Sequence, residues 1–277
     1  MIGKIKRLNR LFNNSGNIIL IPMDHGVTLG PIKGLSNMKQ SIDRLIKNGA
    51  DSILLHKGMI MHNYNLLRDK NIGLIMHLSG STSIGANPDY KIITGSIYEA
   101  ISMGCDAVSI HINIGTNKEP EMLKDFAQIS SECYKYGIPL LAMIYIRGGK
   151  ITNEYDKNLV KHAARIGAEL GADVVKVNYT GDIESFHEVV DSCPVPVIIA
   201  GGEKINDDVL IFKMVADAIQ AGAKGISIGR NIFQHENIEV MLKIMSLIIH
   251  NKEPFDRVID TYREMIKEKS LVAATKE

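Results

Sequence analysis

The chain has 277 residues, of which 45% are hydrophobic and 23% charged, with a formal net charge of +1. This size and composition suit a soluble protein of one large α/β domain or two small ones. Because the chain has no long lysine/arginine tract, we expect no binding to nucleic acid or to an anionic membrane. The basic N-terminal residues precede no apolar segment with a cleavage site, so we expect neither a signal peptide nor a membrane span. Cys105, Cys133 and Cys193 are scattered without CxxC spacing, which favours reduced thiols in the cytoplasm over disulfides or a zinc site.

Short apolar runs alternate with amphipathic segments along the chain, which is typical of repeated βα units around a parallel sheet. Eight strands are predicted: Ile18 to Asp24, Ser52 to His56, Gly73 to Leu78, Ala107 to Ile112, Pro139 to Tyr145, Val174 to Asn178, Val195 to Ala200, and Gly225 to Gly229. Helical spacing of apolar residues predicts helices between them, among them Met38 to Lys47, Met122 to Lys135, Asn158 to Leu170, and Asp208 to Gln220.

Several strands follow a glycine that suits the left-handed end of a helix, as in Gly49-Ala50-Asp51 and Gly171-Ala172-Asp173. This repeated punctuation favours an α/β fold of the (β/α)8 TIM-barrel type over a flavodoxin-like or Rossmann sheet. The first strand also ends in Asp24-His25-Gly26 instead of a dinucleotide-binding GxGxxG. We expect residues 1–277 to form a single barrel domain, with an extra C-terminal helix from Pro254 to Glu268.

A lysine stands among β-branched residues in the predicted strand Val174 to Asn178. Burial of an amine favours its neutral, nucleophilic form, which a Schiff-base lysine needs in order to attack a carbonyl. Because side chains alternate along a strand, Val174, Lys176 and Asn178 share one face, and Lys176 can point into a barrel. The alternative is a lysine at the strand's end whose stem is buried and whose charge reaches water.

The active site of a parallel barrel lies at the carboxyl ends of its strands, and these ends are polar here. The seventh and eighth strands are followed by Gly201-Gly202 and Gly229-Arg230. In this fold such loops bind phosphate through backbone N–H groups, a helix N-terminus and a bidentate arginine. The alternative is that the glycines only form tight turns and that Arg230 pairs with a nearby carboxylate.

Asp24 and Tyr145 complete a Schiff-base set with Lys176. We expect Asp24 to move a proton during carbinolamine dehydration or C–C cleavage, and Tyr145 to act on the substrate hydroxyl. The structural alternatives are an Asx turn at Asp24 and a packing role for the Tyr145 ring.

Four histidines lie near the ends of successive strands: His25, His56, His77 and His111. Without HxH or HExxH spacing, partners of a substrate hydroxyl or of catalytic residues are a better interpretation than a metal site. We therefore expect no metal.

Five segments together resemble the archaeal-type class I aldolase (DhnA) family over nearly the whole chain. They are Ile21 to Gly26, Ala142 to Gly148, Val174 to Tyr179, Ala200 to Gly202, and Ile228 to Asn231. The resemblance implies that Lys176 forms the Schiff base, that Asp24 accepts a proton and that Tyr145 donates one. It also implies substrate contacts from these three residues and from His25, Gly26, Val27, Thr28, Ile146, Arg147, Gly201, Gly202, Gly229 and Arg230.

Within the family, the sequence is most similar to the transaldolase-type synthases that open an archaeal route to 3-dehydroquinate and the aromatic amino acids. The implied substrates are 1-deoxy-D-threo-hexo-2,5-diulose 6-phosphate and L-aspartate 4-semialdehyde, used without metal or organic cofactor. The resemblance also implies a homo-oligomer, often a decamer, in the cytoplasm.

The main alternative is a class I fructose-1,6-bisphosphate aldolase. Those members of the family tend to carry Trp two residues before the catalytic Tyr, where this chain has Met143 like the synthases. Ile146 departs from the usual Tyr-Pro-Arg-Gly motif, which leaves the position of Tyr145 and Arg147 in doubt. A metal-dependent barrel lyase and a sugar-phosphate sensor are further alternatives.

Overall fold

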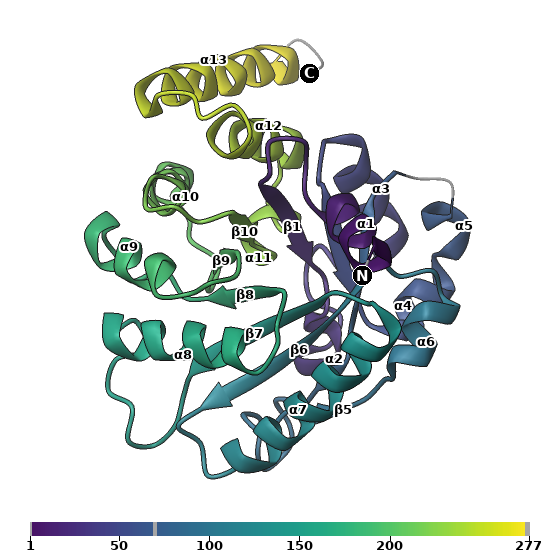
Figure 1. Ribbon diagram of the computed structural model, residues 1–277. Helices are drawn as coiled ribbons and strands as arrows, with labels where there is room; N and C mark the ends of the chain where they lie inside the picture. Colours follow the sequence, from purple (N-terminus) through teal and green to yellow (C-terminus); the bar gives the residue numbers. More distant parts are fainter. Residues whose placement is uncertain (1, 69–70, 275–277) are drawn as a thin grey trace.

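Eight parallel strands close into a barrel in the computed structural model, which describes residues 2–68 and 71–274 (Figure 1). The strands are β1 (Ile18–Pro22), β2 (Ser52–Leu55), β3 (Gly73–His77), β6 (Ala107–Ile114), β7 (Leu140–Ile146), β8 (Val174–Val177), β9 (Val197–Ala200) and β10 (Gly225–Ser227). Their order around the barrel is β1-β10-β9-β8-β7-β6-β3-β2, and β1 pairs with β10 to close it. The prediction of a (β/α)8 barrel is confirmed, and each predicted strand is present with bounds that differ by at most two residues.

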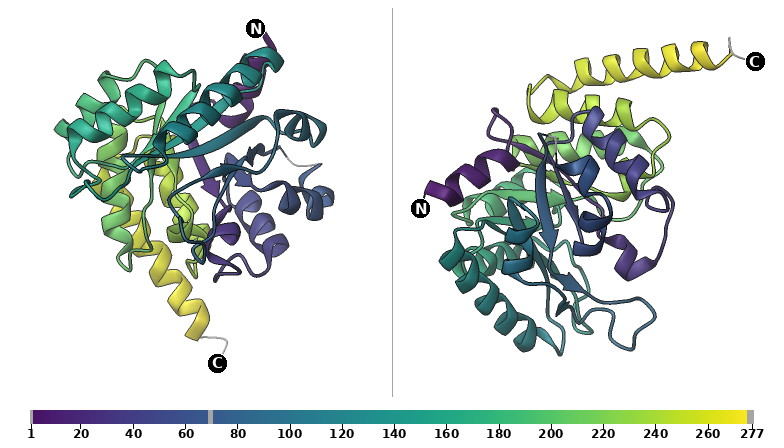
Figure 2. Two further views of the ribbon diagram at one scale, coloured as in Figure 1. Left: turned by 90° about the horizontal axis from the view of Figure 1, so that it is seen from below. Right: turned by 90° about the vertical axis from the view of Figure 1, so that its right-hand side faces the viewer.

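Helices surround the barrel and cover the outer face of its strands (Figures 1 and 2). Between the strands lie α2 (His25–Leu29), α3 (Met38–Lys47), α4 (Lys57–His62), α5 (Tyr64–Leu67), α6 (Ile97–Ser102), α7 (Glu119–Tyr136), α8 (Lys157–Glu169), α9 (Ile183–Asp191) and α10 (Asp208–Gln220). After β10 come α11 (Arg230–Phe233), α12 (Ile238–Ile249) and α13 (Phe255–Ala274), and α13 packs across α12. A small antiparallel pair, β4 (Ser79–Gly80) with β5 (Ile92–Ile93), follows β3 and was not predicted.

Side-chain alternation along the strands divides the core into two layers. Val175 and Val177 of β8 pack in the larger cluster between strands and helices. Val174 belongs instead to the cluster inside the barrel, with Leu141 and Met143 of β7. Both strand faces are therefore covered, which explains why the sequence reads as continuous apolar runs. The same alternation directs the residue two positions after Val174 toward the interior.

The helix α1 (Ile2–Leu11) lies at the N-terminal end of the barrel, where Leu8, Leu11 and Phe12 pack on the inner cluster (Figure 2). The sequence was not interpreted as helical there. Basic residues of α1 form ion pairs with aspartates that precede strands: Arg10 with Asp106 at 2.5 Å and Lys4 with Asp173 at 2.8 Å.

The Gly-Ala-Asp motif and its Gly-Cys-Asp variant have a structural role at the N-terminal end of the barrel. The carboxylates of Asp51, Asp106 and Asp173 accept backbone N–H groups of Ile19, Leu74 and Leu140, at 2.6, 3.0 and 2.9 Å. Each aspartate thus fixes the start of its own strand against that of the preceding strand.

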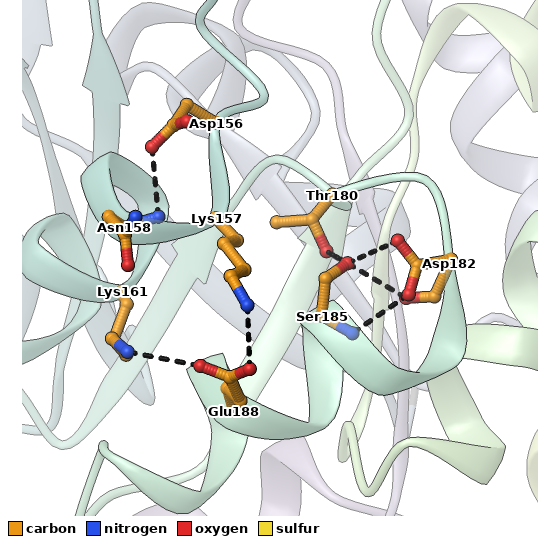
Figure 3. A network of polar contacts seen from close by, with 8 residues as sticks. All are labelled: Asp156, Lys157, Asn158, Lys161, Thr180, Asp182, Ser185 and Glu188. Atoms are coloured by element: carbon orange, nitrogen blue, oxygen red, sulfur yellow. Dashed lines mark hydrogen bonds and ion pairs between the residues drawn. The ribbon is translucent and has the colours of Figure 1, made fainter.

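The helices that follow β7 and β8 are also joined to each other (Figure 3). Asp156 and Asp182 cap the N-termini of α8 and α9 through their side chains. Lys157 and Lys161 of α8 both contact Glu188 of α9, at 2.8 and 3.2 Å. Exposed pairs of this kind contribute little stability. They connect α8 to α9 on the outer side of β8, the strand that carries Lys176.

Candidate active site

A cavity of about 520 Å³ lies at the carboxyl ends of the strands. Of the predicted site residues, ten line it: Asp24, His25, Thr28, Tyr145, Arg147, Lys176, Gly201, Gly202, Gly229 and Arg230. Gly26, Val27 and Ile146 do not line the cavity. The side chain of Ile146 is buried in the core between strands and helices, because its neighbour Tyr145 takes the inward face of β7.

Lys176 points into the barrel from β8 and is 5% exposed. Its Nζ lies 5.9 Å from the centroid of the Tyr145 ring. The two side chains meet because β7 and β8 are paired, with Met143 opposite Lys176 in the register. An amine and a phenol therefore face one small volume from adjacent strands.

Asp24 follows β1 and stands close to three histidines. Its carboxylate lies 3.6 Å from Nε2 of His77 and 3.7 Å from Nδ1 of His25, and the rings of His77 and His56 are 5.2 Å apart. Burial by itself would raise the pKa of Asp24, but the nearby His77, His25, Lys176 and His56 outweigh it and hold the pKa well below its usual range. Asp24 is therefore an ionised carboxylate at neutral pH.

The histidines around Asp24 are neutral at neutral pH. Burial lowers the pKa of His77 to about 4, although Asp24 acts in the opposite direction. Its Nδ1 lies 2.7 Å from Oγ of Ser109, which fixes the ring. Burial also lowers the pKa of His25 and His56. These rings can therefore orient Asp24 or a substrate hydroxyl without adding charge.

Tyr145 is held between two side chains at the cavity wall. Its ring centroid lies 4.8 Å from that of His111 and 5.0 Å from the guanidinium carbon of Arg147. Burial lowers the pKa of His111 well below its usual range, and its Nε2 lies 2.9 Å from Oδ1 of Asn113. Such fixed rings can position the Tyr145 hydroxyl for proton transfer.

The two glycine loops lie side by side because Asn231 ties them together. Its amide nitrogen donates to the carbonyl groups of Gly201 and Glu203, and its Oδ1 accepts from the N–H of Ile205. A Cβ at Gly229 would stand 2.7 Å from the Pro22 carbonyl oxygen, so this position requires glycine.

The guanidinium of Arg230 reaches the same loops. It donates to the Gly202 carbonyl at 3.0 Å and lies 4.0 Å from the fully exposed carboxylate of Glu203. Nε of Arg230 and Oγ of Ser227 are buried without a hydrogen-bond partner among the described residues. Both side chains line the cavity, so they can bind an anion there.

Three polar cavity residues were missed from the sequence, namely Lys91, Glu154 and Tyr155. They lie in long connections that follow β3 and β7, not at strand ends, so the barrel rule did not select them. Glu154 accepts from the amide of Asn178 at 3.2 Å. No local motif distinguishes Lys91, and only the fold brings it to the cavity.

The described part of the chain holds neither a cluster of metal ligands nor a helix that could span a membrane. Residues 2–68 and 71–274 contain no group of three or more His, Cys, Asp or Glu side chains placed to hold a metal ion. Within the same ranges, no helix combines the length and apolarity that crossing a membrane requires.

Comparison with known proteins gives a consistent family assignment. The family model described as DeoC/LacD family aldolase matches residues 18–235. A curated relative from Archaeoglobus fulgidus, 2-amino-3,7-dideoxy-D-threo-hept-6-ulosonate synthase 1, is 40% identical over 96% of this chain and 98% of its own length. A relative from Streptomyces griseus, 2-amino-4,5-dihydroxy-6-oxo-7-(phosphonooxy)heptanoate synthase, is 37% identical over 88% of this chain and 89% of its own.

The structural comparison agrees with the sequence comparison. The crystal structure of an archaeal fructose 1,6-bisphosphate aldolase superposes with a TM-score of 0.83 at 31% identity, over 90% of this chain and 99% of that one. A further archaeal fructose-1,6-bisphosphate aldolase structure, with its catalytic Lys bound to a carbinolamine intermediate, has a TM-score of 0.82, 31% identity and coverage of 89% and 99%.

Proposed function

Because this chain belongs to the DeoC/LacD family of aldolases, we propose that it is a 2-amino-3,7-dideoxy-D-threo-hept-6-ulosonate synthase. The reaction transfers a three-carbon unit from 1-deoxy-D-threo-hexo-2,5-diulose 6-phosphate to L-aspartate 4-semialdehyde. The observation that carries the proposal is the buried amine of Lys176 inside the barrel, in one cavity with Asp24 and Tyr145.

In the first half-reaction, Nζ of Lys176 attacks the C2 ketone of the diulose phosphate, and loss of water gives an imine. Asp24, ionised and close to Lys176, takes a proton from the nitrogen during this dehydration and returns it to the departing hydroxyl. Tyr145 then takes the proton of the C4 hydroxyl and passes its own phenolic proton to the imine nitrogen as the C3–C4 bond breaks. The electron pair of that bond passes into the imine, which leaves an enamine on Lys176 and a phosphorylated dicarbonyl fragment.

In the second half-reaction, the enamine carbon attacks the aldehyde carbon of L-aspartate 4-semialdehyde. The aldehyde oxygen takes a proton from Tyr145 as the new C–C bond forms. Water then hydrolyses the imine, which frees the seven-carbon amino product and restores the amine of Lys176. The whole transfer needs neither an oxidant nor a reductant.

The names of the relatives support an amino-acid acceptor. Both products are seven-carbon acids with a 2-amino group, and they differ at the other end, where one carries a phosphonooxy group. Met143 lines the cavity at the position where the resemblance expects Trp in fructose-bisphosphate aldolases. The synthase is therefore favoured over the aldolase alternative.

Borohydride trapping with product analysis tests the proposal. The enzyme is incubated with diulose phosphate, fructose 1,6-bisphosphate or dihydroxyacetone phosphate, with and without L-aspartate 4-semialdehyde, then reduced and mapped by peptide mass spectrometry. We expect an adduct on Lys176 and a seven-carbon amino product from the diulose phosphate. Triose phosphates from fructose 1,6-bisphosphate alone would move the assignment to the aldolase, and an unmodified Lys176 with every donor would refute the Schiff-base mechanism.

Three further expectations belong to this proposal. We propose that the chain works as one barrel domain, that it assembles into a homo-oligomer, of which the decamer is the expected form, and that it acts in the cytoplasm. Its three cysteines are buried free thiols, which supports a reducing compartment. Light scattering during gel filtration measures the assembly, and a mass of one or two subunits would contradict the decamer.

A further inference from the structure

We propose that Lys91 binds the carboxylate of the acceptor aldehyde, which makes it a specificity-determining residue of the second half-reaction. This inference rests on the proposed function and adds a residue at the cavity that neither motif nor strand end indicates.

Lys91 is an interior lysine with an unfilled donor. It is 7% exposed and lines the cavity that holds Lys176. Its Nζ donates to Oγ of Ser81 at 2.5 Å and to the carbonyl of Pro88 at 2.9 Å. Both partners are neutral, and within residues 2–68 and 71–274 no carboxylate lies within ion-pair distance of Nζ. An ammonium has three donors, so one remains for a ligand.

The segment that carries Lys91 is fixed to the barrel. Lys91 directly precedes β5, which pairs with β4 so that Ile92 lies opposite Gly80. Oγ of Ser79 accepts the N–H of His111, and the amide of Asn113 donates to the Asp89 carbonyl at 2.7 Å. The pairing of β5 with β4 and the hydrogen bonds to β6 therefore hold the ammonium at a defined place over β6.

The order of the strands separates Lys91 from the glycine loops. Arg230 follows β10, which is two strands from β8 on one side, whereas β6 is two strands from β8 on the other. Lys176 on β8 thus lies between two cationic regions. Arg147, which follows β7, belongs with Lys91, because it contacts Asp89 at 3.8 Å. Lys91 and Arg147 thus form one cationic region of the cavity, and Arg230 forms the other.

The charge around Lys91 also fits a carboxylate ligand. Burial lowers the pKa of Lys91 and the charge of Arg147 acts in the same direction, whereas the carboxylates of Asp89 and Asp24 act against them. A buried ammonium that has only neutral hydrogen-bond partners is unfavourable until an anion binds to it. The acceptor's carboxylate supplies that anion three carbons from the reacting aldehyde, and it leaves again with the product.

Acceptor selectivity of a Lys91→Met variant tests the inference. Three acceptors are compared: L-aspartate 4-semialdehyde, succinic semialdehyde, which keeps the carboxylate but lacks the amine, and butanal, which lacks both. We expect kcat/KM to fall roughly 30-fold or more for the two carboxylate-bearing acceptors, in line with the loss of a charged hydrogen bond. The value for butanal should stay within about threefold.

Two further variants separate a binding role from a structural one. Ser81→Ala removes a hydrogen bond of Lys91 but keeps its charge, so selectivity should persist. Lys150→Met removes an exposed lysine outside the cavity and serves as the matched control for charge. An equal fall for all three acceptors in Lys91→Met, or no fall, would overturn the inference.

The donor half-reaction gives an independent readout. The diulose phosphate concentration that gives half of the maximal borohydride adduct should be the same in Lys91→Met and the wild type, and a higher concentration in Lys91→Met would assign Lys91 to the donor and overturn the inference. If the wild type itself forms no seven-carbon product, the proposed function fails before any variant is made, and the inference falls with it.

Discussion

Nζ of Lys176 lies 5.9 Å from the ring centroid of Tyr145, and the two residues stand on the adjacent strands β8 and β7. Because both strands belong to a closed barrel, the backbone positions of the two residues are fixed relative to each other. Each group can therefore be tested by a substitution that leaves the other in place.

Lys176→Arg should abolish imine formation, because a guanidinium is not a nucleophilic amine. We expect turnover to fall by on the order of 10⁴-fold, as for other covalent nucleophiles, with no borohydride adduct at position 176. Lys161→Arg on the surface of α8 is the control. Full turnover of Lys176→Arg would show that the mechanism is wrong.

Tyr145→Phe should slow the C–C bond steps and spare the imine. Loss of a positioned acid/base group costs about 10²- to 10⁴-fold in rate, so we expect kcat to fall by that amount. The borohydride adduct should still form with the diulose phosphate. Tyr134→Phe, at an exposed position, should behave as the wild type. An adduct-free Tyr145→Phe enzyme would instead place Tyr145 in imine formation.

Arg230→Met should weaken phosphate binding at the glycine loops. A hydrogen bond to a charged group is worth about 1.5–3 kcal/mol, so we expect KM for the diulose phosphate to rise roughly 10- to 100-fold. Steady-state kinetics at saturating acceptor measure the effect, and Arg263→Met on the exposed side of α13 is the control. An unchanged KM would mean that the phosphate binds elsewhere in the cavity.

His77 should make stability fall as the pH drops from about 6.5 to 4. Its pKa is lowered from 6.5 to about 4 in the folded protein, so over this range the unfolded chain binds a proton that the folded protein does not. Stability therefore rises with pH across this window, by about 1.4 kcal/mol per unit from this one proton.

Urea unfolding at pH 7 and pH 5 measures this dependence. We expect His77→Gln to lose one proton's share of the slope, whereas His162→Gln, on the surface side of α8, should keep it. Asp24 does not interfere, because the stability that its lowered pKa provides is lost only below the unfolded pKa of 3.8. A slope that is identical in His77→Gln and the wild type would contradict a neutral buried His77.

Asp106→Ala should destabilise the N-terminal end of the barrel by about 2 kcal/mol. The substitution leaves the buried N–H of Leu74 without its acceptor and removes the partner of Arg10. Because Arg10 is largely exposed, most of the loss comes from the backbone group. Asp106→Asn keeps an acceptor oxygen and should cost less; equal losses in urea unfolding would indicate that the charge matters more.

The sequence predicted the barrel because its strands are covered on both faces. Continuous apolar runs such as Val195 to Ala200, each preceded by a helix-ending glycine, leave few other arrangements. The catalytic candidates were found for the same reason: Asp24, Tyr145 and Lys176 are polar interruptions at strand ends. Their proximity to one another then follows from the closure of the sheet.

Other parts of the molecule had no local signal. The helix α1 carries many charges, and its apolar Ile2 and Ile5 remain exposed, so its buried or partly buried apolar stripe is limited to Leu8 and Leu11. Lys91 lies between Tyr90 and Ile92 in a connection of ordinary composition, and only the pairing of β4 with β5 brings it to the cavity. Tertiary contacts determine where long loops between barrel elements lie, and no local sequence pattern indicates these contacts.

The plug formed by α1 has a consequence for the kinetics. Leu8, Leu11 and Phe12 fill one end of the barrel, so the phosphorylated fragment departs through the same mouth by which the aldehyde arrives. The first product and the second substrate therefore use one opening of the cavity above Lys176. We therefore expect a double-displacement rate law in which the first product and the second substrate compete with each other. The closed end of the barrel and the chemistry of the imine both lead to it.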